Sequence, residues 1–316
     1  MLRYILIGIG LLIAAIIGLG FSLRWDGLSA LNLADRLWPG QSGHLVAAGR
    51  AYGTDLAQAI DIYAPGKTAR DARLPVIIWY NGGGWASGTR QQYGFVGRAL
   101  SAEGFVVAVV NYRHAPAHRF PAFIADTRDA LRWVHGSIAG YGGDADRLVL
   151  MGQSAGAHMA MLTILDQRWS GAYGLRGGPV KGVVGISGPY DFLPFEPGGM
   201  ADVAMGDAPN LADTQPINFA RGDAPPILLL TGDADVTVRP RNSRRLLAAV
   251  ASAGGSARLV EYPHVAHRDT AMAFSLPFRA MAPVLRDSVA FARRVTAQPA
   301  ANAASTAANA SARSAE

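Results

Sequence analysis

Short apolar runs alternate with segments of helical length and pattern from residue 44 to residue 296. Runs that are apolar throughout are typical of strands buried on both faces of a sheet. Parallel strands need long crossover connections, so strands separated by helices predict a mostly parallel sheet covered on both faces. The alternation therefore predicts one α/β domain over residues 44–296.

The expected elements follow from this pattern. The apolar runs interpreted as strands are 59–63, 76–80, 105–110, 148–151, 183–186, 227–230 and 258–262. The segments interpreted as helices are 92–102, 122–135, 155–165, 241–253 and 283–295. Segments 167–181 and 192–224 are rich in Gly, Pro and Asp, which predicts loops near the mouth of a site.

The N-terminus carries a long apolar segment. Residues 5–23 contain no charged side chain and are bounded by Arg3 and Arg24. At 1.5 Å per residue this stretch spans a bilayer core of about 30 Å. The alternative is a cleaved signal peptide, whose apolar core is usually shorter. We interpret residues 1–24 as one transmembrane helix, with Trp25 at the membrane interface.

Localisation and the flanking segments follow from this anchor. The short N-terminal tail favours export, so we expect a membrane-anchored protein with its catalytic domain on the periplasmic or extracellular side. Residues 25–43 predict a juxtamembrane amphipathic helix or a cap over the mouth of the site. Residues 297–316 are small and polar without periodicity, which predicts a disordered tail.

Composition excludes several classes of function. The chain has a formal charge of +6, but its arginines are scattered along the sequence. A nucleic-acid-binding protein gathers such charges into a patch, so we expect no nucleic-acid partner. The chain contains no cysteine. This excludes disulfides, thiolate catalysis and cysteine-ligated metal sites.

The first chemical motif is the pentapeptide Gly152-Gln153-Ser154-Ala155-Gly156. The expected strand 148–151 runs straight into it, and the expected helix 155–165 leaves from it. A sharp strand-to-helix turn exposes a serine hydroxyl, and the flanking glycines relieve crowding in that turn. This context predicts that Ser154 is a nucleophile activated by a nearby base.

A second motif, Asn81–Trp85, follows the expected strand 76–80 and contains three consecutive glycines. Acyl transfer places negative charge on the carbonyl oxygen, and backbone N–H groups can hold that oxyanion. Glycines allow the backbone to come close to the substrate. We expect the amides of Gly83 or Gly84 and of Ala155 to form an oxyanion hole.

These motifs carry a resemblance to the α/β-hydrolase-fold esterases, near the hormone-sensitive-lipase group and the BD-FAE-like esterases. The similarity continues at Asn111–Arg113 and Tyr141–Asp144 and covers residues 45–296. That family usually has His before the oxyanion glycines, where this chain has Asn81. The resemblance implies an α/β-hydrolase fold with a central sheet of about eight strands.

The order expected of this fold is Ser, then an acid, then His. The family acid is the second aspartate after a late strand, which selects Asp235; Asp233 is the competitor and suits turn chemistry. The family base ends a Tyr-Pro-x-x-x-His pattern, which selects His267 over His264. We therefore expect Ser154, Asp235 and His267 to form a catalytic triad.

The other histidines have different interpretations. His158 lies one helical turn after Ser154, and we expect it to pack or to form hydrogen bonds. His114 and His118 have the spacing of zinc ligands on a helix, but Pro116 lies between them, so we predict no metal site. No Gly-x-Gly-x-x-Gly motif opens a helix after a first strand, and no cofactor is expected.

Together these features predict a serine carboxylesterase that hydrolyses a small carboxylic ester through an acyl-enzyme on Ser154. By resemblance, feruloyl or acetyl esters of polysaccharides are further candidate substrates. Two other functions stay open at this stage. One is a membrane-tethered, non-catalytic binding or scaffold protein on a hydrolase fold. The other is a transacylase or amidase that uses the same triad.

Overall fold

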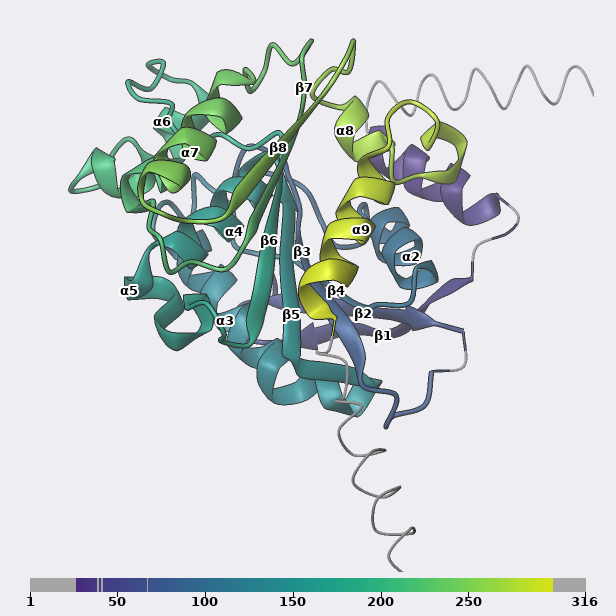
Figure 1. Cartoon of the computed structure of the whole chain (residues 1–316). Coiled ribbons are helices and arrows are strands. Elements are labelled where there is room, and N and C mark those ends of the chain that lie inside the picture. The colour runs from purple at the N-terminus through teal and green to yellow at the C-terminus, as the bar shows by residue number, and fades with distance from the viewer. Residues whose placement is uncertain (1–26, 39, 41, 67, 298–316) are drawn as a thin grey trace, which may run out of the picture.

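The computed structural model describes residues 27–38, 40, 42–66 and 68–297 of the 316-residue chain (Figure 1). Its strands are β1 (Gly43–Ala51), β2 (Ala59–Pro65), β3 (Leu74–Tyr80), β4 (Val106–Val110), β5 (Gly143–Gln153), β6 (Val180–Ile186), β7 (Ile227–Gly232) and β8 (Ala257–Tyr262). Its helices are α2 (Gly94–Ala102), α3 (Ala122–Ser137), α4 (Ala155–Leu165), α5 (Gln167–Ser170), α6 (Met200–Met205), α7 (Arg241–Ser252), α8 (Asp269–Met272) and α9 (Val284–Thr296).

All eight strands form one sheet in the order β1-β2-β4-β3-β5-β6-β7-β8. β1 pairs antiparallel with β2, and β2 pairs antiparallel with β4. Every later pairing, from β4–β3 through β7–β8, is parallel. The prediction of a mostly parallel sheet of about eight strands is confirmed. Because the parallel strands share one direction, the loops that follow β3, β5, β7 and β8 meet at one edge of the sheet.

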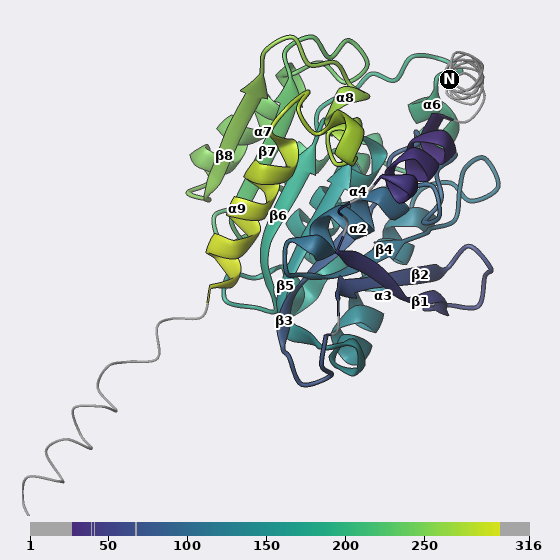
Figure 2. The ribbon, with the colours of Figure 1, turned by 90° about the vertical axis from the view of Figure 1, so that its right-hand side faces the viewer.

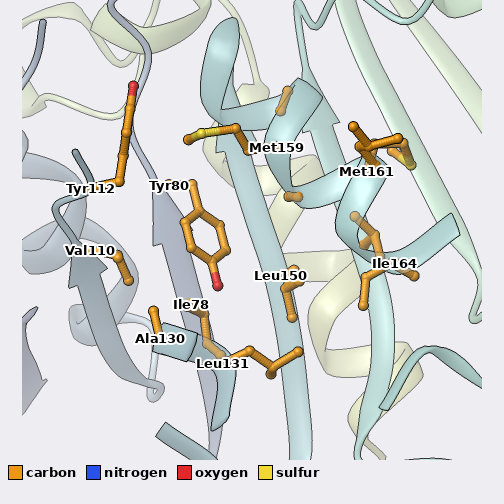
Figure 3. Packing of buried hydrophobic residues seen from close by; sticks show 14 of the residues in the cluster. Ile78, Tyr80, Val110, Tyr112, Ala130, Leu131, Leu150, Met159, Met161 and Ile164 are labelled. Atoms are coloured by element: carbon orange, nitrogen blue, oxygen red, sulfur yellow. The ribbon is translucent and has the colours of Figure 1, made fainter. Parts of the chain in front are cut away.

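Successive residues of each central strand point into two different apolar layers, as the two-residue period of a strand requires. Ile78 and Leu150 belong to the layer formed with α3, α4 and α7, part of which is drawn in Figure 3. Ile77 and Trp79 belong to the opposite layer, formed with α2 and α9, which lie in front of the sheet in Figure 2. The sheet is thus covered on both faces, which makes it a rigid base for the loops at its edge.

Residues 27–37 are helical, as one interpretation of segment 25–43 predicts. The helix buries Leu31 in the layer that contains α2. Asp35 is fully buried, and its Oδ2 accepts a hydrogen bond from Arg98 Nη2 of α2 at 2.8 Å. Its Oδ1 accepts from the backbone N–H of Leu276 at 2.9 Å. The helix is therefore docked on the domain by a buried carboxylate, while Leu37 on its outer side remains exposed.

Two parts of the fold differ from the expectation. β1 was not expected, because only Gly43 and Ala47 of its residues are buried and an edge strand of this kind lacks a clear apolar pattern. The segments expected to be loops contain short helices, among them α5 and α6, since their polar and glycine-rich sequences conceal single helical turns. Both differences lie outside the parallel core.

None of the helices within the described residues is long and apolar enough to span a bilayer. The predicted anchor at residues 5–23 lies outside the described residues, as does the predicted disordered tail from residue 298 onward. Both stay predictions.

Candidate active site

The turn between β5 and α4 presents Ser154 at the edge of the sheet. Its backbone has φ 55° and ψ −122°, a conformation that L-residues rarely adopt. A Cβ on Gly156 would lie 2.0 Å from the backbone oxygen of Tyr80, and one on Gly152 would lie 2.4 Å from Gly156. Glycine at both positions therefore lets the helix start directly against β3 and β5, which fixes the serine in its turn.

Three side chains meet at this edge of the sheet. Ser154 Oγ lies 3.0 Å from His267 Nε2, and His267 Nδ1 lies 2.8 Å from Asp235 Oδ2. The serine follows β5, the aspartate follows β7 and the histidine follows β8. Because Asp235 accepts through Oδ2, Nδ1 of His267 carries a proton and Nε2 is free to accept from the serine hydroxyl. This arrangement can remove a proton from Ser154.

Asp235 is held by its own turn. It is 2 % exposed, and its Oδ1 accepts hydrogen bonds from the backbone amides of Thr237 and Val238 at 3.0 and 2.8 Å. The competing residues lie elsewhere. Asp233 Oδ1 accepts from the backbone N–H of His264 at 2.6 Å, and both side chains are exposed. Their contact joins the two loops after β7 and β8. The hydrogen-bonded series that reaches Ser154 consists of Asp235 and His267.

The glycine loop after β3 lies directly beside the serine, since a Cβ on Gly82 would stand 3.2 Å from Ser154 Cβ. Gly83 and Gly84 have φ values of 130° and 61°, which side-chain-bearing residues disfavour. Ala155 is the first residue of α4, so its amide has no acceptor inside the helix. The N–H groups of these three residues are therefore candidate donors to a negatively charged oxygen near Ser154.

Asn81 occupies the position where the resembling family usually has His. Its side chain is fully buried, and Nδ2 makes only a long contact of 3.4 Å with the Gly82 carbonyl. Its Oδ1 has no hydrogen-bond partner among the described residues. The backbone carbonyl of Asn81 accepts from the hydroxyl of Tyr112 at 3.2 Å, which ties the base of the loop to the segment after β4.

Trp85 and His158 form a contact that the sequence did not reveal. The indole Nε1–H of Trp85 donates to His158 Nδ1 at 3.1 Å, and His158 Nε2 lies 2.8 Å from the carbonyl oxygen of Thr214. Burial lowers the pKa of His158 to about 4, so the ring is neutral at physiological pH. The prediction that His158 packs and forms hydrogen bonds agrees with these contacts.

Gln153 and Tyr93 were likewise not expected near the site. The side-chain Nε2 of Gln153 lies 3.4 Å from both His267 Nε2 and the His267 carbonyl oxygen. Burial raises the pKa of the Tyr93 hydroxyl, and a hydrogen bond from the Gly82 backbone amide opposes that effect. Gln153 could have been suspected from its place beside Ser154, whereas Tyr93 carries no sequence signal.

Three apolar side chains lie close to the glycine loop and to Asp235. Met200, the first residue of α6, is 62 % exposed, and its Sδ would lie 2.5 Å from a Cβ on Gly84. Phe192 stacks on Trp85 with ring centroids 6.0 Å apart. Val236, directly after Asp235, is also exposed. Apolar side chains thus lie beside both the glycine loop and Asp235, together with polar ones such as Gln153 and Thr237.

The histidines with zinc-like spacing are joined by a backbone hydrogen bond, from His118 N–H to the His114 carbonyl at 2.9 Å, but their side chains have different partners. His118 Nε2 lies 3.8 Å from Asp55 Oδ2, whereas the His114 ring packs edge-on against Tyr112. Across the described part of the chain, His, Cys, Asp and Glu form no group of three or more that could hold a metal ion.

Curated relatives of this chain are esterases by name. Esterase LipQ of Mycobacterium tuberculosis is 31 % identical over 258 residues, which is 76 % of this chain and 61 % of LipQ. Isoprenylcysteine alpha-carbonyl methylesterase ICME of Arabidopsis thaliana is 27 % identical, with 69 % of this chain and 55 % of that protein covered. The chain thus spans about six tenths of the length of these relatives.

Solved structures share the fold. Esterase B from Lactobacillus rhamnosis superposes with a TM-score of 0.72 at 22 % identity, covering 90 % of this chain and 96 % of that one. A carbohydrate esterase from gut microbiota gives a TM-score of 0.70 at 23 % identity, covering 82 % and 98 %. At these identities the likeness establishes the α/β-hydrolase fold alone.

The BD-FAE family model matches residues 60–250, from strand β2 into helix α7. The matched region includes the glycine loop, the serine turn and Asp235. Since it takes in more than half of the chain, the chain belongs to the BD-FAE family.

Proposed function

We propose that this protein is a serine carboxylesterase that works through an acyl-enzyme on Ser154. The observation that carries the proposal is the hydrogen-bonded series from Ser154 Oγ through His267 to Asp235, with distances of 3.0 and 2.8 Å. An esterase needs a nucleophile, a base and a group that orients the base, and these three residues supply them in that order.

In the first half of the reaction, Ser154 Oγ attacks the ester carbonyl carbon and its proton moves to His267 Nε2. The carbonyl π electrons move to oxygen, which gives a tetrahedral oxyanion. The bond to the alkoxy oxygen then breaks, and the proton on His267 Nε2 passes to that oxygen, which leaves as the alcohol. Asp235 keeps Nδ1 of His267 protonated and stabilises the imidazolium throughout.

In the second half, water attacks the acyl carbon while His267 Nε2 takes one of its protons. The second tetrahedral oxyanion collapses, the bond to Ser154 Oγ breaks and the proton returns to that oxygen. The carboxylic acid leaves and the free enzyme is restored. Every step uses groups of this chain and one water molecule.

Both tetrahedral intermediates place negative charge on one oxygen. The amide of Ala155 and the amides of Gly83 or Gly84 stabilise this oxygen as an oxyanion hole. Loss of one such donor costs about 2.7–4 kcal/mol of transition-state stabilisation. These donors are backbone N–H groups and not the side chain at residue 81, so Asn81 in place of the family's usual His is compatible with this role.

The substrate is a small ester with an apolar group beside its carbonyl. Met200, Phe192 and Val236 offer apolar surface around the entrance and no charge with which to select an ionic group. The names of the relatives LipQ and ICME, an esterase and a methylesterase, agree with ester chemistry. Esters of acetate and butyrate are therefore suitable first substrates.

The proposal is tested with the full-length protein in mild detergent, using p-nitrophenyl acetate and butyrate. The parent and a Ser137→Ala control, changed at the end of α3, should hydrolyse both esters. Ser154→Ala should lose about 10⁶ in kcat, the loss seen when a triad serine is removed. If the parent neither hydrolyses a broad ester panel nor reacts with a serine-directed phosphonate, the proposal is wrong.

A second test separates the two aspartates after β7. Asp235→Asn should lower kcat by about 10⁴, because the amide favours the wrong histidine tautomer. Asp233→Asn keeps the size of the side chain and should leave kcat within the error of the parent. Steady-state kinetics on p-nitrophenyl butyrate distinguish them. Equal activity of Asp235→Asn and the parent would show that Asp235 is not the acid of the triad.

For the intact chain, the apolar stretch 5–23 supports a membrane anchor that holds the enzyme on the exported side. The test is extraction of the membrane fraction with alkaline carbonate, followed by protease treatment of intact cells or spheroplasts. Retention in the membrane and protease access from outside are expected. Release by carbonate would contradict the anchor, and protection from the protease would contradict the orientation.

A further inference from the structure

His158 connects three parts of the molecule through its two ring nitrogens. Trp85 Nε1 can only donate a hydrogen bond, so His158 Nδ1, at 3.1 Å, must accept it. Nε2 then carries the ring proton and donates to the Thr214 carbonyl oxygen at 2.8 Å. The two partners therefore fix a single neutral tautomer. A buried ring with both nitrogens engaged can neither rotate nor change its proton without losing a hydrogen bond.

Trp85 follows directly on the two glycines proposed for the oxyanion hole. Its backbone has φ 61°, a left-handed conformation that is uncommon for a large side chain and strained. Such a conformation persists only where the surroundings determine it. The indole is 5 % exposed, stacks on Phe192 at 6.0 Å and meets the His158 ring edge-on at 5.2 Å. The indole thus anchors the end of the loop, as Tyr112 anchors its base.

The same histidine is fixed to the nucleophile. His158 lies on α4, and its backbone N–H donates to the carbonyl of Ser154 at 3.1 Å. The amide of Ala155 belongs to the same first turn. The contact between Trp85 and His158 consequently joins the helix that carries one proposed oxyanion donor to the loop that carries the others. It adds a side-chain contact between the two elements to the close backbone approach at Gly82 and Gly156.

We propose that His158 is a positioning residue for the oxyanion hole, acting through Trp85 to hold the amides of Gly83 and Gly84 opposite that of Ala155. The inference rests on the proposed esterase function. It adds that a buried, non-nucleophilic histidine outside the triad contributes to stabilising the transition state. His158 touches no reacting atom in this role, and its effect is carried by backbone position.

The test compares two replacements of His158. His158→Gln supplies an amide oxygen that can accept from Trp85 and an amide N–H that can donate to Thr214. His158→Phe keeps a ring of similar size but has no polar atom. His158→Phe should lower kcat by about 10², the effect of misplacing a catalytic group by roughly 1 Å, with KM little changed. His158→Gln should restore most of that loss.

Trp85→Phe completes a double-mutant cycle, since it keeps an aromatic ring but removes the indole N–H together with part of the ring. Trp85→Phe alone should lower kcat to a similar extent, and the double variant Trp85→Phe/His158→Phe should be no worse than either single variant. His135→Phe on α3 is the matched control, because that ring packs on Tyr173 away from the site. It should retain the kcat of the parent.

A further readout separates positioning from a general structural effect. Butylboronic acid forms a tetrahedral adduct with an active serine and places an oxygen in the hole, as the transition state does. Its affinity should fall in His158→Phe by the same factor as kcat/KM. Unchanged boronate affinity in a folded variant, or full kcat in His158→Phe, would overturn the inference while the parent stays active. An inert parent would instead refute the esterase function itself.

Discussion

Two histidines near Ser154 have different chemistry because their neighbours differ. His267 has a carboxylate on one nitrogen and the serine hydroxyl on the other, and its side chain is 15 % exposed. His158 has an indole N–H and a backbone carbonyl, and it is fully buried. The first set of partners can accept and stabilise a proton, whereas the second cannot, because protonated Nδ1 would face the Trp85 N–H.

This difference predicts how stability depends on pH. The pKa of His158 is lowered to about 4 by burial, against 6.5 for the free side chain, so the unfolded chain binds the extra proton more readily. The contribution of His158 to stability is fully present above pH 6.5 and is lost as the pH falls towards 4. The expected loss is about 3 kcal/mol.

The measurement is urea unfolding of the parent and of His158→Gln at pH 7 and at pH 4. The parent should lose more stability than the variant over this interval, by about 3 kcal/mol, because Gln does not titrate. An equal loss in the two proteins would show that His158 is not the group responsible.

At the residue scale, the sequence predicted those parts of the candidate site that belong to local motifs. Ser154, Asp235 and His267 each lie at a fixed place after a strand, and the structure brings them within hydrogen-bond distance. The contact of Trp85 with His158 could not be predicted, since it depends on how α4 packs against the loop after β3. A side-chain contact across two elements leaves no spacing pattern in the sequence.

At the scale of elements, the buried strands and the helices that pack on them were predicted well, because each carries a strong apolar signal. The expected helix 155–165 agrees with α4 at both ends. β1 was not predicted because its exposed residues include the apolar pair Leu45 and Val46, so that apolar and polar residues do not alternate along it. Pairing with β2, and not the pattern of β1 itself, makes this segment a strand.

Two glycines in helices should respond in opposite ways to alanine. A Cβ on Gly136, near the end of α3, would have no heavy atom within 4 Å, so Gly136→Ala should stabilise the protein by about 0.5–1 kcal/mol. A Cβ on Gly156 would lie 2.0 Å from the Tyr80 backbone oxygen. Gly156→Ala should destabilise by roughly 1–3 kcal/mol, because β3 and α4 must separate.

Urea unfolding at pH 7 measures both changes, and ester hydrolysis measures their effect on the site. Gly136→Ala should keep full activity, whereas Gly156→Ala should lose activity as well as stability. A Gly156→Ala protein as stable as the parent would mean that the close approach of α4 to β3 is not required.

At the scale of the whole molecule, Asp35 holds the helix 27–37 on the domain. Its buried carboxylate accepts from Arg98 and from the Leu276 amide, so Asp35→Ala leaves the Leu276 amide without this acceptor and leaves Arg98 with the two oxygens of Asn32. A buried hydrogen-bond donor that has lost its acceptor destabilises the folded state by about 1–3 kcal/mol, which favours local opening of the helix. Trypsin cleavage after Arg36 should then become about tenfold faster or more, since proteolysis follows the open population.

The measurement is limited trypsin digestion followed by mass spectrometry of the fragments. Asp207→Ala, which removes an exposed ion pair with Arg119 on the surface, is the matched control and should be cleaved at Arg36 no faster than the parent. Equal cleavage rates for Asp35→Ala and the parent would show that the apolar contacts of the helix and the hydrogen bonds of Asn32 hold it without Asp35.

The stretch between β6 and β7, residues 187–226, contains no member of the proposed triad, yet Phe192 and Met200 from it touch Trp85 and Gly84. The proposed triad and two of the three apolar side chains beside it therefore lie in separate segments of the chain. Because the same stretch also supplies Thr214, whose carbonyl oxygen lies 2.8 Å from His158 Nε2, selectivity is better redesigned at an exposed position such as Met200 than by exchanging the whole stretch.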